Sequence, residues 1–370
     1  MKKIVAFLTA TAILFSFVGC KKKEIDPGLA AGKNGKRVNY NYNMSDYVTL
    51  GNYLGITVDK TSDAYKNYAN SYYSDLVANA DAYIYIKEGV LAKDDTAMIE
   101  FVGRIDGKEF EGGKSDEESP LTLGSNSFIP GFEDALIGKS IGKTEVITVT
   151  FPDDYDQTTY FIDDTKQENG FSLKGKKAEF TVKINSKRVL PEQNDETAKK
   201  LGFENKDEFL KDTERIVAET IIRDTITSSN GFAVKSFPEI EKARYDEIYN
   251  EVVSLAQQQA SEYNAQYGTE VDAETMLYYM YGYTLDNLKS YYQDVQKIEI
   301  ILYAIFDAEN LTFTEQEYND FLSETAKQNS TSTETVTVEK VKEDYDAWQL
   351  EAMIVTELAM KYLVKSAVIK

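Results

Sequence analysis

Apolar residues recur at every second position between Asp94 and Arg188. Because successive side chains of a strand point to opposite faces, this spacing predicts half-buried antiparallel strands. Three sets of residues carry the alternation: Ala97, Ile99 and Phe101; Ile147, Val149 and Phe151; and Ala178, Phe180, Val182 and Ile184. The pair Asp106-Gly107 lies between the segments IEFVGRI and KEF and predicts a hairpin turn.

The stretch GSNSFIPGFEDALIG, residues 124–138, interrupts the strands and predicts a short helix. Pro130 suits the first turn of a helix, and Gly138 stands where a helix would end. Phe132 and Leu136 are one turn apart and therefore share one face.

From Leu190 onward the period changes from two to 3.6, which predicts amphipathic helices. Three helix faces carry this period: Tyr245, Ile248, Tyr249, Val252 and Ala256; Leu285, Leu288, Tyr292, Val295, Ile298, Leu302 and Ile305; and Val341, Tyr345, Trp348, Ala352, Val355 and Tyr362. Thr284 and Thr314 are predicted N-caps, the latter with Glu317 in a capping box. We expect residues 191–370 to be all helix, so the fold class is α+β.

Residues 44–92 form a smaller segment before the alternating strands. The β-prone stretch from Tyr47 to Val58 leads into a helix that begins near Thr61, with Thr61 or Ser62 as its cap. The segment is too short to be a domain by itself.

The amino terminus has the order of an export signal. Lys2 and Lys3 precede an apolar run that ends at Val18, and Gly19 and Cys20 follow. This resembles a bacterial lipoprotein signal over residues 1–20, which implies that Cys20 is lipidated. A plain cleaved signal or a short membrane anchor are the alternatives, although the run is shorter than the ~20 residues of a spanning helix. Residues 21–43 read as a flexible tether whose basic cluster is either solvated or in contact with anionic lipid headgroups.

The composition of the chain excludes several kinds of site and function. The chain has 370 residues and a net charge of −21, which argues against nucleic-acid binding because such binding needs clustered cations. It contains no histidine, which excludes catalytic triads with histidine and imidazole-based metal sites. Cys20 is the one cysteine, so no disulfide is expected within the chain. Asp163, Asp164 and Glu168 lack the spacing of a calcium loop, and we expect no metal and no cofactor.

Three ordered stretches carry a resemblance to a known family: DTAMIEFVGRIDGKEFEGGK, LTLGSNSFIPGFEDALIGKSIGKTEVITVTFPDDY and LKGKKAEFTVKI. Together they resemble an FKBP-type peptidyl-prolyl isomerase domain, in the version found in trigger factor. The resemblance covers residues 93–190 and implies a small antiparallel sheet wrapped on the short helix, which floors a ligand pocket.

The resemblance also implies the residues of that pocket. Catalytic positions fall on Phe101, Phe110, Ile129, Phe132, Tyr155 and Phe180, and substrate-binding positions on Glu111, Leu121 and Phe128. Tyr160 or Phe161 are alternatives to Tyr155, because residues 156–170 form an insertion relative to trigger factor. An apolar cavity suits proline isomerisation, since removing water from the carbonyl favours the twisted, less polar transition state. The same phenylalanines, read without the resemblance, fit a plain hydrophobic core.

Residues 191–370 resemble the C-terminal chaperone region of trigger factor in their order of helices. The ribosome-binding domain of that family does not match the N-terminal part of this sequence, which argues against ribosome binding. Unfolded or nascent exported proteins and proline-containing peptides are the expected partners, with the membrane bound through the N-terminal lipid. The stretch MLYYMYGY, residues 276–283, either contacts clients or packs between helices.

The sequence thus predicts an extracytoplasmic foldase, lipid-anchored to the bacterial cell membrane, with isomerase and chaperone activity. The alternative is a binding-only chaperone or interaction lipoprotein whose isomerase pocket is vestigial. A solute-binding lipoprotein is disfavoured because no alternation of strands and helices in two lobes appears.

Overall fold

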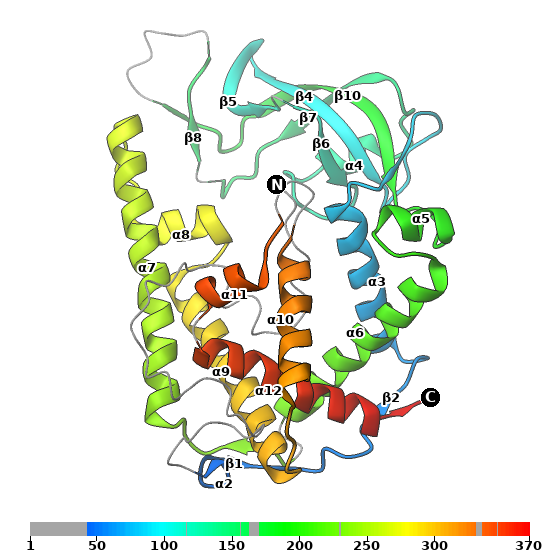
Figure 1. Cartoon of the computed structure of the whole chain (residues 1–370). Helices are drawn as coiled ribbons and strands as arrows, with labels where there is room; N and C mark the ends of the chain where they lie inside the picture. Colours follow the sequence, from blue (N-terminus) through cyan, green and yellow to red (C-terminus); the bar gives the residue numbers. More distant parts are fainter. Residues whose placement is uncertain are drawn as a thin grey trace. The chain divides into compact units, whose positions relative to one another are not determined.

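The computed structural model describes residues 43–370 except 116, 156, 163–169, 229–230, 331–334 and 346. The predicted signal with Cys20, nearly all of the predicted tether, and the acids Asp163, Asp164 and Glu168 lie outside the described residues. The chain divides into two compact units. We call residues 80–206 the sheet unit, and residues 43–79 together with 207–370 the helical unit (Figure 1).

The sheet unit is built on two long antiparallel strands, β4 and β10. β10 also pairs with β7 and β3, and β4 pairs with β5 and β6. The unit comprises β3 (Ile84–Ile86), β4 (Thr96–Ile105), β5 (Lys108–Lys114), β6 (Ser119–Thr122), α4 (Phe132–Leu136), β7 (Thr144–Thr150), β8 (Thr158–Thr159), β9 (Phe171–Ser172), β10 (Lys177–Val189) and α5 (Asp195–Lys200).

The predicted alternation is confirmed along β10, where Ala178, Phe180, Val182 and Ile184 are all buried. These residues face one core together with α4, over which the sheet curves (Figure 1). The predicted hairpin joins β4 to β5, and both Asp106 and Gly107 have positive φ, as a type I′ turn requires.

The short helix α4 lies where it was predicted, with Phe132 and Leu136 both buried. Its start differs from the prediction for Pro130. Gly131 is the N-cap and has a φ of 89°, which only glycine adopts at little cost, so Pro130 lies before the cap. Gly138 follows the helix and also has a positive φ.

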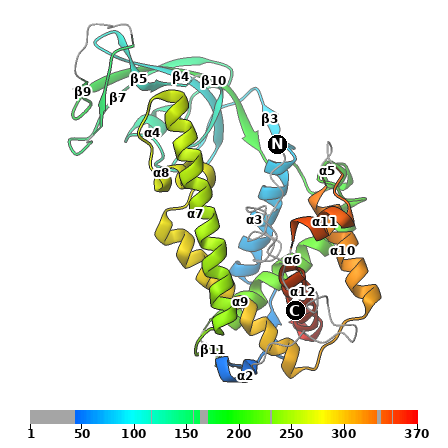
Figure 2. The ribbon, with the colours of Figure 1, turned by 60° about the vertical axis from the view of Figure 1, so that its left-hand side comes forward.

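The helical unit joins the N-terminal segment to the long helices (Figures 1 and 2). It comprises α2 (Met44–Tyr47), β1 (Val48–Thr49), β2 (Thr57–Val58), α3 (Asp63–Asn79), α6 (Lys206–Thr227), β11 (Ala233–Val234), α7 (Glu239–Tyr267), α8 (Ala273–Tyr281), α9 (Leu285–Ala308), α10 (Glu315–Asn329), α11 (Val338–Asp344), α12 (Ala347–Ser366) and β12 (Val368–Ile369).

The helix α3 is held along α6 by polar and aromatic contacts. The Tyr72 hydroxyl donates to Asp212 at 2.5 Å, and the rings of Tyr73 and Phe209 lie 5.6 Å apart between centroids. The predicted segment 44–92 is therefore not one piece: residues 44–79 pack in the helical unit, and residues 80–92 belong to the sheet unit. Residues 191–206 likewise group with the sheet unit.

Two expectations for the C-terminal half are wrong. The half is not all helix, because β11 pairs with β1 and β12 pairs with β2. The face that runs from Val341 to Tyr362 belongs to two helices, since Tyr345 is extended and ends α11. This break lets Val341 enter the main helical core while Trp348 packs near Tyr245 in a second core.

The predicted caps are confirmed. Ser62 accepts a hydrogen bond from the Tyr65 N–H at the start of α3, which decides between Thr61 and Ser62. Thr284 caps α9, and Thr314 caps α10 with Glu317 completing the capping box. In the part of the chain that the structure describes, no helix is long and apolar enough to span a membrane.

Candidate active site

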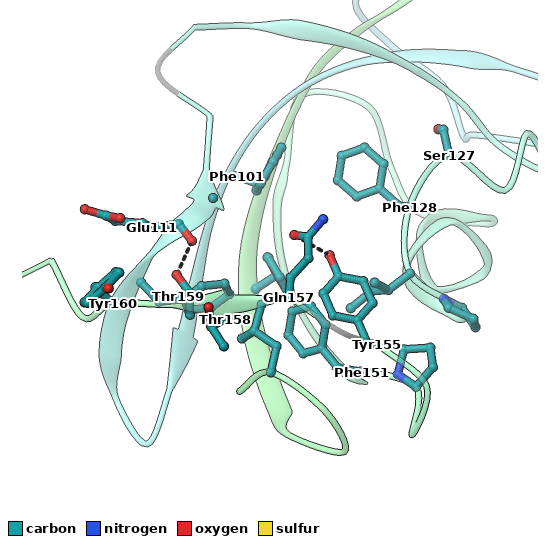
Figure 3. A pocket seen from close by; sticks show the side chains of 17 residues that line it. Phe101, Glu111, Ser127, Phe128, Phe151, Tyr155, Gln157, Thr158, Thr159 and Tyr160 are labelled. Atoms are coloured by element: carbon teal, nitrogen blue, oxygen red, sulfur yellow. Dashed lines mark hydrogen bonds between the residues drawn. The ribbon is translucent and has the colours of Figure 1, made fainter. Parts of the chain in front are cut away.

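The sheet unit contains a cavity of about 670 Å³ whose walls are mainly aromatic (Figure 3). Its lining residues are Phe101, Phe110, Glu111, Gly112, Ser127, Phe128, Ile129, Pro130, Phe151, Pro152, Tyr155, Gln157, Thr158, Thr159, Tyr160, Leu173 and Phe180. Glu111 is the only carboxylate among them, and none carries a positive charge. The cavity therefore offers apolar contact and hydrogen bonding rather than a titrating acid and base.

The aromatic wall is a connected set of rings. Phe101 lies edge-on to Phe128 at 5.4 Å between centroids, and it reaches Phe180 at 6.0 Å. Phe110 continues the wall from Phe180 at 6.3 Å. Contacts of this kind stabilise aromatic clusters beyond the area that they bury, so the wall is shaped in advance of any ligand.

Two glycines let these rings approach the backbone. A Cβ on Gly103 would lie 2.5 Å from the Phe180 ring, and a Cβ on Gly113 would lie 2.6 Å from the Phe110 ring. Both distances are too short for real contacts. Glycine is thus required at these positions by the shape of the pocket wall.

Glu133 of α4 holds the loop that carries Phe128 and Ile129. Its side chain is buried with 6% exposed, and its two oxygens accept from four backbone N–H groups. The donors are Gly124 at 2.7 Å, Asn126 at 3.1 Å, Ser127 at 2.8 Å and Phe128 at 3.1 Å. Burial opposes the charge of the carboxylate, but the four donors outweigh it and lower the pKa of Glu133.

The next N–H along this loop belongs to Ile129. It donates to no acceptor among the described residues, and Ile129 lines the cavity. The Ile129 carbonyl, in contrast, accepts from the Phe132 N–H at 3.1 Å. The loop therefore uses its N–H groups up to Phe128 for its own structure, whereas the N–H of Ile129 has no protein acceptor among the described residues.

The described parts of residues 152–176 form a second wall. The Glu111 N–H donates to the Tyr160 carbonyl at 2.9 Å, and the Thr159 hydroxyl donates to the Glu111 carbonyl at 2.7 Å. β8 and β9 pair within this segment, and the Phe161 and Phe171 rings stack at 4.3 Å. These contacts fix the segment against β5, so the insertion is part of the pocket.

Seven of the nine predicted pocket residues line the cavity: Phe101, Phe110, Glu111, Phe128, Ile129, Tyr155 and Phe180. Phe132 and Leu121 do not line it, because both are buried in the core. The Phe132 ring lies 4.4 Å from Phe128 and 5.2 Å from Phe180 between centroids, so it supports the lining from behind. Of the alternatives to Tyr155, Tyr160 lines the cavity as well and Phe161 does not.

Sequence reasoning missed several lining residues. Phe151 directly follows β7 and continues its alternation, and its spacing from Ile147 and Val149 was a usable signal. Gln157 and Thr158 lie in the insertion and Leu173 lies just after it, where the pattern has no period that marks them.

Comparisons with known proteins agree with this geometry. The family of FKBP-type peptidyl-prolyl cis-trans isomerases matches residues 88–185. Trigger factor from Desulforamulus reducens is 32% identical over 296 residues, which are 76% of this chain and 62% of that protein. Trigger factor from Shouchella clausii is 30% identical over 300 residues, or 78% of this chain and 65% of that protein. The chain is thus similar to trigger factor over about three quarters of its length, and residues 88–185 match the FKBP-type family.

The cavity lies within the part of the chain that matches the FKBP-type family, because every lining residue falls between 88 and 185. The chain spans less than two thirds of the length of these two relatives. One solved structure comes from work on promiscuous substrate recognition by the trigger factor chaperone. The match covers 86% of this chain and 72% of the chain in that structure. Its identity to this chain is 15%, and the TM-score is 0.27.

Proposed function

We propose that the sheet unit catalyses cis-trans isomerisation of X-Pro peptide bonds in unfolded polypeptides. One observation carries the proposal. The N–H of Ile129 has no acceptor among the described residues, and it lies at an aromatic cavity that has no acid-base pair. Rotation of an X-Pro bond faces a barrier of about 18–20 kcal/mol, which arises from amide resonance. An apolar wall removes water from the amide, and a fixed N–H orients a neighbouring carbonyl, so neither step needs a proton transfer.

The test compares two matched substitutions in the full chain. Phe101→Leu shortens a half-buried ring of the pocket, while Phe203→Leu makes the same change at a half-buried position outside the lining. The assay is the refolding rate of a protein whose slow phase is proline isomerisation. We expect Phe101→Leu to lower kcat/KM by about tenfold, equivalent to about 1.4 kcal/mol, and Phe203→Leu to leave it unchanged. Equal effects of the two variants would refute a role for this pocket.

We propose further that the helical unit holds unfolded clients. Four exposed tyrosines in α7 and α8 support this. Tyr278 and Tyr279 of α8 are 59% and 65% exposed, and Tyr263 and Tyr267 at the end of α7 are exposed as well. Tyrosine combines apolar area with a polar tip, which suits loose contact with many sequences. Met276 and Leu277 of the same stretch are buried, so the client contact would use only part of it.

The third element of the proposal is location. The order of Lys2, Lys3, an apolar run and Cys20 supports export and a lipid anchor, which would place the foldase outside the cytoplasm. Exported polypeptides in the course of folding would then be its clients. A diacyl group supplies two chains, and two anchoring signals give stable membrane attachment.

A further inference from the structure

Gln157 occupies a position in the pocket that no expectation covered. It lies in the segment fixed against β5, and its side chain lines the cavity. The Leu173 N–H donates to the Gln157 carbonyl at 3.1 Å, so the backbone at this residue is held. Figure 3 shows the side chain reaching in between Phe101, Phe128 and Tyr155.

The Tyr155 hydroxyl donates its hydrogen bond to Oε1 of Gln157 at 3.3 Å. A phenol has one O–H donor, and in this arrangement that donor is directed at Gln157. The Gln157 amide has two N–H donors on Nε2, and among the described residues neither finds an acceptor. Within this pair, therefore, the donors without a protein acceptor are those of Gln157.

We propose that Gln157 positions the substrate by donating a hydrogen bond from Nε2 to a peptide carbonyl next to the proline. This inference rests on the proposed isomerase function. Ile129 would hold one backbone carbonyl with its N–H, and Gln157 would hold a second one. Both of these carbonyls would lie outside the X-Pro amide, so the rotating carbonyl would stay among the apolar walls that contact the proline ring.

Three variants of the full chain separate this role from a purely structural one. Gln157→Leu removes both the acceptor for Tyr155 and the donors to substrate. Gln157→Glu keeps an acceptor for the Tyr155 hydroxyl but removes the donors. Tyr155→Phe removes the hydroxyl and leaves the donors of Gln157 in place. The melting transition of each variant confirms that it is folded.

The readout is the dissociation constant of a proline tetrapeptide, measured by calorimetry, together with KM and kcat. We expect Gln157→Leu and Gln157→Glu both to raise Kd and KM by about three- to tenfold, the effect of one lost hydrogen bond, and to change kcat less. Tyr155→Phe should change Kd less than twofold.

Wild-type affinity in Gln157→Glu would overturn the inference, because the residue would then serve only to hold Tyr155. A larger loss in Tyr155→Phe than in Gln157→Leu would overturn it as well. Peptide binding is measured without reference to catalysis. A wild-type chain that binds the peptide through Gln157 without accelerating isomerisation would therefore refute the isomerase function and retain this binding role.

Discussion

The buried carboxylate of Glu133 sets the shape of the pocket mouth, and Glu133→Gln tests this claim. Each oxygen of Glu133 accepts from two backbone N–H groups. An amide has only one oxygen, so whichever way it turns, its NH2 group faces two N–H donors. Each unsatisfied buried donor costs about 1–3 kcal/mol, so with two such donors we expect the loop to lose about 2–6 kcal/mol of local stability.

Amide hydrogen exchange of residues 124–128 measures this loss directly, because it reports local opening of the loop. A loss of about 2 kcal/mol corresponds to about a 30-fold faster exchange, since 1.4 kcal/mol is a factor of ten. Glu145→Gln is the matched control. It makes the same change in charge on β7, where Glu145 forms a surface ion pair with Lys139 at 3.0 Å, and such pairs contribute about 0–1 kcal/mol.

The pH dependence has a defined sign. The folded-state pKa of Glu133 lies below its usual value, so the charged form stabilises the fold. That contribution is present above the unfolded pKa of about 4.3 and is lost as pH falls through the folded value. The difference in exchange between wild type and Glu133→Gln should therefore shrink below about pH 4. Exchange in Glu133→Gln within threefold of the control at pH 7 would refute the reasoning.

Three other predictions follow from the wall, the tyrosines and the amino terminus. Gly103→Ala would press a methyl group against Phe180, so it should destabilise the sheet unit by about 1–3 kcal/mol and weaken peptide binding. Amide hydrogen exchange in β10 measures the first effect and calorimetry the second; unchanged hydrogen exchange would contradict the wall geometry. The double variant Tyr278→Ser/Tyr279→Ser should suppress client aggregation less than wild type, by light scattering, without altering kcat/KM; full suppression would exclude these tyrosines as client contacts. Cys20→Ala should move the protein from the membrane fraction to the soluble fraction or leave it unprocessed, and an unchanged mature mass and membrane yield would rule out lipidation.

The sequence was sufficient to predict those strands and helices that show a clear period of apolar residues. The alternation of Ala178, Phe180, Val182 and Ile184 predicts one buried face, and β10 has that face. The strands β11 and β12 have two residues each, so they are too short to show a period, and they were missed. The break at Tyr345 was missed as well, because apolar residues continue at helical spacing across it.

The site residues were predictable where they lie in the stretches that resemble the FKBP-type family, and less so elsewhere. Period alone marks both Phe101 and Phe132 as core residues, and it does not tell which ring lies against the cavity and which lies behind it. Gln157 belongs to a polar, aperiodic insertion, so only the contacts with β5 reveal that it reaches the pocket. Glu133 reads in the sequence as an acid in the first turn of a helix, whereas its role depends on the path of the loop before that helix.

The central claim is that this chain accelerates rotation about X-Pro bonds. The direct measurement is cis-trans exchange of a proline tetrapeptide by NMR exchange spectroscopy, with increasing amounts of the full-length wild-type protein. The account predicts an exchange rate that rises in proportion to protein concentration and falls again when an FKBP ligand fills the cavity. An exchange time that stays at the uncatalysed value of about tens to hundreds of seconds, while the protein still suppresses aggregation, would contradict the claim and identify a binding-only chaperone.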